Sequence, residues 1–155
     1  MFRPRIIPVL LLDGQGLVKT VRFGKPRYIG DPINAVRIFN DLQVDELIFL
    51  DIRATQEDRS LSIELVKQLG DEAFMPFAVG GGIKNIEQVG ALLKAGAEKV
   101  VVNSAATENI DFIKEIAFSY GNQSVVGSVD VKKGLFGKLN VYSRGGNVKT
   151  PLDLT

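Results

Sequence analysis

Three consecutive glycines, Gly80 to Gly82, follow a short apolar segment and lead into an amphipathic one. Because glycine has no Cβ, the backbone N–H groups of such a loop can approach an anion closely, and a glycine loop that opens into a helix commonly binds phosphate. Asn103 and Ser104 end the next apolar segment and add an amide and a hydroxyl. We therefore predict that Gly81, Gly82, Asn103 and Ser104 form one phosphate site, with a flexible turn as the alternative for the glycines.

Acid and base chemistry in this chain depends on carboxylates, Lys or Tyr. The sequence contains neither histidine nor cysteine, which excludes a thiolate nucleophile, a disulfide and a cysteine-based zinc site, and removes the commonest general base. We expect neither a metal ion nor a cofactor. Asp51 and Asp130 each end an apolar segment, so either carboxylate could serve as acid or base, with a capping role as the alternative.

Charged residues mark the opposite ends of the apolar segments. Arg5, Glu46 and Lys99 each begin one of these segments. In a barrel of parallel strands such ends point to one face, so the three charges could meet as a ring opposite the phosphate site. Three separate, solvated strand ends are the alternative.

Two kinds of segment alternate along the chain and must position these side chains. Five apolar runs rich in Val, Ile and Leu are continuous rather than alternating, which is typical of strands buried on both faces of a parallel sheet. They occupy residues 5–12, 46–51, 75–79, 99–103 and 124–130. Between them, apolar residues recur at intervals of three and four and predict helices, over residues 33–42, 61–69, 86–93 and 113–120.

Capping residues support these helices. Asp31 precedes Pro32, and Asn85 stands three residues before Gln88, which are sequence signals of helix starts. Glycines are expected to end helices, at Gly70, Gly96 and Gly121. Strict alternation of strand and helix predicts an α/β fold with a parallel sheet, and a hairpin is expected at residues 17–23 after the first strand.

A weak internal repeat supports a barrel. Residues 31–50 align with residues 84–103 at an offset of 53 (99 − 46 = 53), which superposes helix on helix and strand on strand. Successive copies of one unit are expected in a barrel built from duplicated pieces.

Amino-acid composition argues against nucleic acid and membrane as binding partners. The chain has 155 residues, 45% hydrophobic side chains and a formal net charge of +1 from 19 basic and 18 acidic residues. This indicates one globular domain without a polybasic surface for nucleic acid or membrane. The apolar run at residues 6–12 is interrupted by Pro8 and is too short to span a bilayer. We expect a cytoplasmic protein that binds neither nucleic acid nor membrane.

Seven short blocks together resemble the cyclase subunit of imidazole glycerol phosphate synthase. They lie in order along nearly the whole chain, at residues 5–7, 30–32, 45–52, 79–83, 96–100, 103–106 and 129–132. The resemblance implies a (βα)8 barrel, or TIM barrel, that receives ammonia from a glutaminase subunit docked at its N-terminal face. It also implies that ammonia passes along the barrel axis and adds to a bisphosphorylated, nucleotide-derived substrate.

The resemblance implies roles for three groups of residues. Three of the family's four gate residues for ammonia match Arg5, Glu46 and Lys99. One phosphate site of the family matches Gly82, Asn103 and Ser104. A lysine of the mobile first loop matches Lys19, and a further substrate contact matches Ser143 after a one-residue gap.

The family's two catalytic aspartates match only in part. Asp130 matches one of them, but Leu11 stands where the other is expected, and Asp13 lies two residues further on. One carboxylate puts the full cyclase reaction in doubt, because that reaction moves protons at two places. Cyclase-like paralogues of surface-polysaccharide pathways, which use ammonia to amidate a sugar, share the segments at residues 10–12 and 17–20. We therefore favour that paralogue slightly over the histidine-pathway cyclase.

Length is the second departure from the family. A complete barrel needs about 250 residues, whereas this chain has 155. We expect a first half-barrel at about residues 1–121 and the start of a second half at residues 122–155. The expected function is that of an ammonia-using enzyme, active when the barrel is complete, on a phosphorylated or nucleotide-linked sugar substrate.

Two other functions compete with this interpretation. The related isomerase of the histidine pathway shares the barrel and the glycine loop, but it has no ammonia to admit, and a ring of Arg5, Glu46 and Lys99 argues against it. The other alternative is a non-catalytic half-barrel that self-associates through its open sheet edges.

Overall fold

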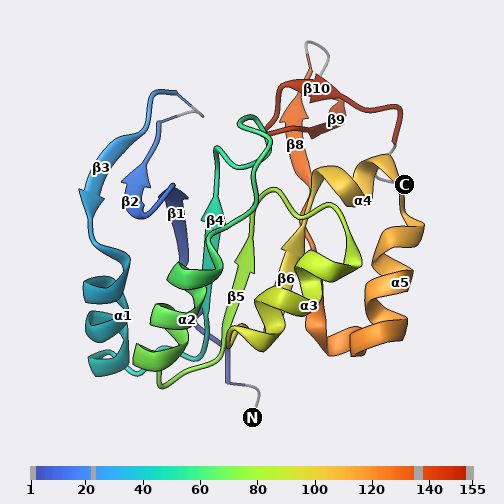
Figure 1. The fold of residues 1–155 in the computed structure, drawn as a ribbon. Coiled ribbons are helices and arrows are strands. Elements are labelled where there is room, and N and C mark those ends of the chain that lie inside the picture. The colour runs from blue at the N-terminus through green and yellow to red at the C-terminus, as the bar shows by residue number, and fades with distance from the viewer. Residues whose placement is uncertain (1–2, 22–23, 135–137, 153–155) are drawn as a thin grey trace.

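The computed structural model describes residues 3–21, 24–134 and 138–152, and its centre is a seven-stranded sheet. Five strands run parallel in chain order: β1 (Val9–Asp13), β4 (Leu47–Asp51), β5 (Phe77–Gly80), β6 (Lys99–Val102) and β7 (Val125–Gly127). Each pairs with the next in sequence, which confirms the predicted α/β fold with a parallel sheet (Figure 1).

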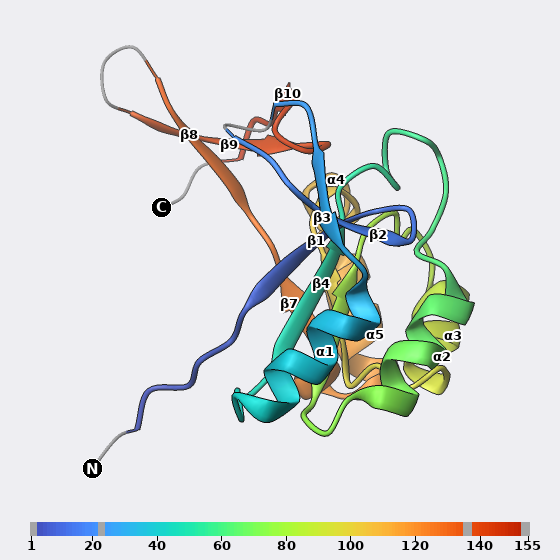
Figure 2. The same cartoon turned by 90° about the vertical axis from the view of Figure 1, so that its left-hand side faces the viewer.

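Helices connect the strands and pack against the sheet. They are α1 (Pro32–Asp41), α2 (Ile63–Glu72), α3 (Ile86–Lys94), the short α4 (Ser104–Glu108) and α5 (Asp111–Tyr120), and the 3-10 turn η1 (Asn122–Ser124) follows α5. Figure 2 shows α1, α2 and α3 on one side of the sheet, with β8 and the segment that leads from residue 3 into β1 on the other. Helices outside and strands inside are the arrangement of a barrel wall.

The predicted hairpin after the first strand is present. β2 (Gly16–Lys19) and β3 (Arg27–Gly30) pair antiparallel with each other, and β2 also pairs with β1, so the sheet is extended at this edge. The turn between β1 and β2 passes through Gly14, whose φ of +63° is accessible to glycine. Residues 22 and 23 of the predicted hairpin lie outside the described residues.

The single strand predicted at residues 124–130 is wrong, because the structure breaks it into two. β7 pairs with β6 only as far as Gly127, opposite Val102. Since β6 ends there and gives way to α4, the chain leaves the central sheet and Asp130 begins β8 (Asp130–Lys133). β8 forms a second, antiparallel sheet with β9 (Leu139–Ser143) and β10 (Val148–Lys149).

Two smaller expectations also differ from the structure. The first strand begins at Val9 rather than at residue 5, since Pro8 has no N–H to donate, although its carbonyl still accepts from the N–H of Ile48 at 3.0 Å. Gly70 lies inside α2 instead of ending it. A Cβ at Gly70 would lie 3.3 Å from the carbonyl oxygen of Ala95, so this glycine permits close packing of α2 against the end of α3.

The other capping predictions are confirmed. The Asp31 side chain accepts from the N–H of Asn34 at 3.0 Å, and Asn85 accepts from the N–H of Gln88 at 2.9 Å. Gly96 and Gly121 follow the ends of α3 and α5 with φ values of +117° and +92°.

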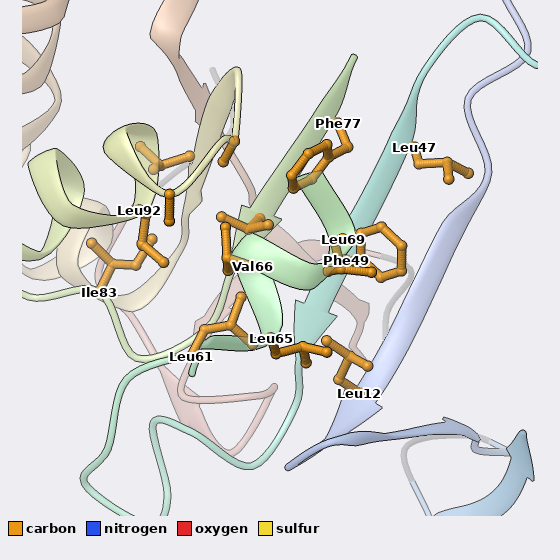
Figure 3. Close-up of a cluster of buried hydrophobic side chains, with 14 of the residues drawn as sticks. Leu12, Leu47, Phe49, Leu61, Leu65, Val66, Leu69, Phe77, Ile83 and Leu92 are labelled. Atoms are coloured by element: carbon orange, nitrogen blue, oxygen red, sulfur yellow. The ribbon is translucent and has the colours of Figure 1, made fainter. Parts of the chain in front are cut away.

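Alternate residues of the central strands point toward the helices and form the core. Figure 3 shows Leu47 and Phe49 of β4 and Phe77 of β5 beside Val66 and Leu69 of α2. Phe49 is fully buried, and its ring meets that of Phe77 edge-on with the centroids 6.3 Å apart. This layer fixes the register between strands and helices, and with it the position of the loops at both ends of the strands.

The internal repeat has a structural counterpart. Adding 53 to the bounds of α1 gives residues 85–94, and α3 spans Ile86–Lys94. The strands that follow these helices, β4 and β6, lie on either side of β5.

Within residues 3–21, 24–134 and 138–152, none of the helices has the length and apolar character needed to cross a membrane.

Replacement of Phe49 by Ala tests the core. We expect the free energy of unfolding in urea to fall by about 3–5 kcal/mol, because the truncation removes a buried ring and leaves a cavity. Phe118→Ala is the matched control, since that ring is 95% exposed, and it should change stability by less than about 0.5 kcal/mol. Similar effects of both variants would contradict the packing of β4 against α2.

Candidate active site

A cleft of about 970 Å³ opens at the carboxyl ends of the central strands, and it collects half of the predicted site residues. Those that line it are Asp51, Gly81, Gly82, Asn103, Ser104 and Asp130, and Leu11 lines it as well. In Figure 1, α4 and β8 to β10 lie at this end of the sheet. The carboxyl ends of parallel strands meet at one edge, which explains why residues far apart in the sequence share the cleft.

The glycine loop and the Asn103–Ser104 turn are neighbours. Gly80 pairs in register with Val101, so the loops that follow β5 and β6 leave the sheet side by side. Both loops line the same cleft. The structure thus brings together the four residues predicted to form one phosphate site.

Glycine is required in this loop for a steric reason as well. Gly81 and Gly82 have φ values of +126° and +68°. A Cβ at Gly82 would lie 1.9 Å from the carbonyl oxygen of Arg59, and one at Gly81 would lie 2.6 Å from that of Asp51. The loop after β4 therefore presses directly against the glycine loop and leaves no room for a side chain.

Asp51 is held in a structural network. Its buried carboxylate accepts from the N–H groups of Arg53 and Ala54, each at 3.0 Å. It also accepts two bonds from the guanidinium of Arg59, at 2.5 and 3.2 Å. The hydrogen bond to Asp51 is the main cause that raises the pKa of Arg59. With both oxygens engaged, Asp51 has the geometry of a residue that shapes the loop after β4.

Asp130 has a different environment. It is half-buried as the first residue of β8, and burial raises the pKa of its carboxyl group. The charge of Lys132 and a hydrogen bond from the backbone of Gly146 act in the opposite direction but do not cancel that effect. A carboxyl group that holds its proton more firmly than usual, at the wall of a cleft, suits a general acid or base.

A turn of residues 144–146, here called the bridging turn, links the two halves of the cleft. Arg144, Gly145 and Gly146 all have positive φ values, of +53°, +65° and +78°. The N–H of Arg144 donates to Ser104 Oγ at 3.0 Å, while Lys132 Nζ donates to the carbonyl of Gly146. The bridging turn therefore ties β8, which carries Asp130, to the Ser104 turn.

The bridging turn was missed in the sequence analysis. The signal was the dipeptide Gly145–Gly146 between the short runs that form β9 and β10, since paired glycines mark turns. Its docking on Ser104 is a contact over 40 residues of sequence and leaves no local signal.

Three further predicted site residues, Asp13, Lys19 and Ser143, are not among the residues that line the cleft. Asp13 ends β1 and pairs with Arg53 at 3.4 Å. Lys19 is exposed on β2, and its neighbour Thr20 lines the cleft. Ser143 is buried at the end of β9, directly before the bridging turn.

At the opposite end of the strands the three predicted charges converge. Lys99 Nζ lies 2.9 Å from one carboxylate oxygen of Glu46, and Arg5 Nη1 lies 4.0 Å from the other, so Glu46 stands between two cations. Glu46 is buried, whereas Arg5 is exposed. Burial alone would lower the pKa of Lys99, but hydrogen bonds to Glu98 and Glu46 outweigh burial and raise it.

No group of three or more acidic side chains suited to a metal ion occurs among residues 3–21, 24–134 and 138–152. Among the groups that line the cleft are the glycine-loop backbone, the Asn103 amide, the Ser104 hydroxyl, the Asp130 carboxyl and charged side chains such as Arg144 and Glu108. These groups can hold an anion and move a proton.

Residues 5–155 match the protein family described as histidine biosynthesis protein. The chain belongs to this family. It is 49% identical over 146 residues to a Pseudomonas aeruginosa protein provisionally named imidazole glycerol phosphate synthase subunit hisF2, covering 94% of this chain and 58% of that protein. A Leptospira interrogans protein, provisionally named imidazole glycerol phosphate synthase subunit HisF, is 48% identical over 151 residues, covering 97% of this chain and 59% of that protein.

The imidazole glycerol phosphate synthase subunit HisF of Streptococcus mutans is 41% identical over 154 residues, covering 99% of this chain and 61% of that protein. The chain thus spans about three fifths of the length of these curated relatives. Membership in the histidine biosynthesis family confirms the resemblance read from the seven sequence blocks. The five consecutive parallel strands are accordingly part of the wall of a TIM barrel.

Gly82→Ala tests the contact between the two loops of this family member. We expect a loss of about 2–5 kcal/mol in the free energy of unfolding, since a positive φ costs about 1–2 kcal/mol and overpacking about 1–3 kcal/mol more. Gly14→Ala is the control: its φ of +63° is nearly the same, but its Cβ would meet no atom within 4 Å. Gly14→Ala should lose only the free energy that the positive φ costs. Equal losses of unfolding free energy in both variants would exclude a steric contact between Gly82 and Arg59.

Two aspartates should affect the pH dependence of stability with opposite sign. The raised pKa of Asp130 means that the folded state holds this proton more firmly than the unfolded state does. The stability of the folded chain therefore falls as pH rises from the ordinary value of 3.8 through the raised pKa. Since Asp130→Asn removes this loss, it should raise stability at pH 7 relative to pH 4. Asp58 has a lowered pKa, because of a hydrogen bond from Lys84 and its charge, so its stabilising contribution is lost as pH falls below the ordinary value of 3.8. Asp58→Asn should therefore lower stability at pH 4 relative to pH 2. Urea unfolding at pH 2, 4 and 7 measures both effects, and a shift opposite to either expectation would refute that assignment.

Proposed function

We propose that the protein is an ammonia-using synthase subunit of the HisF type, which adds ammonia to a phosphorylated substrate bound at the carboxyl ends of its strands. The observation that carries the proposal is the cleft that joins the glycine loop, the Asn103–Ser104 turn and Asp130. The names of the relatives, imidazole glycerol phosphate synthase subunits, support the same activity.

The phosphate of the substrate is assigned to the glycine loop and the turn after β6. The N–H groups of Gly81 and Gly82 carry no neighbouring Cβ and can approach phosphate oxygens closely. Ser104 Oγ accepts a hydrogen bond from the N–H of Arg144 and donates a long one, of 3.4 Å, to Asn103 Oδ1, which it can exchange for a bond to an anion. Together these groups would hold one phosphate and orient the rest of the substrate toward Asp130.

Asp130 is the proposed acid or base. Its raised pKa favours proton exchange with a substrate, and general catalysis by a positioned carboxyl typically contributes a factor of about 10²–10⁴ in rate. Asp51 is assigned to the architecture of the loop instead, because four hydrogen bonds occupy its carboxylate.

The proposed entrance for ammonia is the ring of Arg5, Glu46 and Lys99, and the proposed partner is a glutaminase subunit docked at that face. The support is geometric: Glu46 bridges the two cations at the amino ends of the strands, opposite the cleft. Ion pairs across an entrance can keep water out, and they can admit a small neutral molecule when they separate. In this scheme the ring separates the ammonia source from the substrate.

A second candidate is the sugar-amidating paralogue that the sequence analysis favoured slightly. The names of the relatives favour the histidine-pathway subunit over it. One observation still supports the paralogue, because Leu11 lines the cleft where the cyclase carries its second aspartate. Asp13 is two residues away and is paired with Arg53.

Self-association through open sheet edges is a third candidate, of another class. β3 and β7 are the outer strands of the central sheet, and unpaired strand edges favour association. A concentration-dependent mass in solution would support it.

The activity is testable in a complete barrel, made by joining this chain to the part of the Streptococcus mutans HisF that lies beyond the match. With ammonium salt and the bisphosphorylated substrate, we expect turnover at least about 10²-fold below that of the Streptococcus mutans protein, because Leu11 cannot exchange a proton. Leu11→Asp should raise turnover, and adding Asp130→Asn should remove that gain.

Full turnover with Leu11 in place would contradict the need for a second carboxylate and would argue against the paralogue. Absence of turnover in every variant, with phosphate binding retained, would instead refute the histidine-pathway activity and favour the paralogue.

A further inference from the structure

Arg144 occupies an unusual position at the edge of the cleft. Its φ of +53° lies in the left-handed region, which residues with a side chain seldom adopt. The next two residues of the bridging turn are glycines with similar φ values, so glycine would fit position 144 with less strain. A strained residue beside a binding cleft points to a use for its side chain.

The side chain of Arg144 is directed to the end of the same helix that begins at Ser104. Its Nε and Nη2 lie 3.1 and 3.0 Å from one carboxylate oxygen of Glu108. Arg144 and Glu108 both line the cleft, and their side chains are 59% and 53% exposed. An exposed ion pair of this kind contributes little to stability, so stabilising the fold does not account for the strained backbone.

The geometry places the guanidinium within reach of an anion at Ser104. The N–H of Arg144 already touches Ser104 Oγ at 3.0 Å, so the two residues are anchored to each other. Ser104 and Glu108 are four residues apart on α4, which is about 6 Å along a helix. Rotation of the Arg144 side chain can therefore move its charge from Glu108 to a group bound at Ser104, without moving the backbone.

We propose that Arg144 is an anion contact of the cleft. Its guanidinium pairs with Glu108 while the cleft is empty and pairs with the phosphate of a substrate once that phosphate binds at Ser104. We call this the reserve contact. This inference rests on the phosphate site proposed above. A phosphate carries more charge than a carboxylate, and the planar guanidinium can bind two of its oxygens at once, so the exchange favours the bound substrate. Glu108 in turn weakens the attraction of the empty cleft for other anions.

The test is the affinity of the 155-residue chain for inorganic phosphate, followed by NMR shifts of backbone amides in the glycine loop. Arg144→Gln should weaken binding by about fivefold or more, because a charge-assisted contact is lost. Arg144→Lys keeps the positive charge but cannot bind two oxygens at once. Its affinity for phosphate should therefore lie between those of Arg144→Gln and the unaltered chain. Glu108→Gln should strengthen binding by about two- to fivefold, since it frees the guanidinium.

The opposite effects expected for Arg144→Gln and Glu108→Gln on phosphate affinity distinguish an anion contact from a purely structural ion pair. Damage to the bridging turn would weaken binding in both the Arg144→Gln and the Glu108→Gln variant, whereas the exchange predicts a gain in the second. The double variant should bind like Arg144→Gln. Lys114→Gln and Asp111→Asn are matched controls, because that exposed pair lies on α5 and carries the same charges; both should leave the affinity unchanged.

Two failures can be told apart. If phosphate binds the unaltered chain and Ser104→Ala weakens it, but neither Arg144→Gln nor Glu108→Gln changes the affinity, the reserve contact is overturned and the phosphate site stands. If the unaltered chain binds no phosphate in the millimolar range, both the phosphate site and the reserve contact are overturned.

Discussion

The contact between the loop after β4 and the glycine loop after β5 determines the shape of the cleft. The carbonyl of Arg59 occupies the space where a Cβ of Gly82 would be, so the two loops can meet only if one of them has no side chain. Asp51 fixes the other side of this contact by accepting two backbone N–H groups and the guanidinium of Arg59. A buried carboxylate needs such a set of partners to offset its desolvation. The glycine loop is thus packed tightly against the loop after β4, while Gly81 and Gly82 also line the cleft.

The sheet gives its two ends separate chemistry. At the carboxyl ends the loops supply the glycine backbone, an amide and a hydroxyl, together with charged side chains such as Arg144 and the carboxyl of raised pKa at Asp130. At the amino ends the connections are short, and charged side chains next to the strands meet directly, as Glu46 does with Lys99. A rigid layer of core residues such as Phe49 lies between these ends, and it keeps the two sets of groups a fixed distance apart. Changes at one end can therefore leave the other intact.

Sequence patterns were sufficient to predict the central parallel sheet and its helices, but they did not predict the second sheet of β8, β9 and β10. The five parallel strands and four main helices have apolar patterns that reflect burial within each segment, and Asp31 and Asn85 mark helix starts through contacts three residues away. The break after β7 has another cause, because it depends on where the neighbouring strand β6 ends. Strand β8 carries three exposed residues after Asp130 and gives no burial signal. The structural role of Asp51 was one of two alternatives in the sequence, but its partner Arg59 could not be predicted, since a loop without regular structure brings it back.

The ion pair of Glu46 and Lys99 has a consequence for the history of the chain. These residues are 53 positions apart, which is also the offset of the internal repeat, so they occupy equivalent places in two copies of one unit. Identical copies would bring two glutamates or two lysines together at 2.9 Å, and like charges repel. If the two units derive from one ancestral unit, the attraction that now joins them arose only after they had diverged at this position.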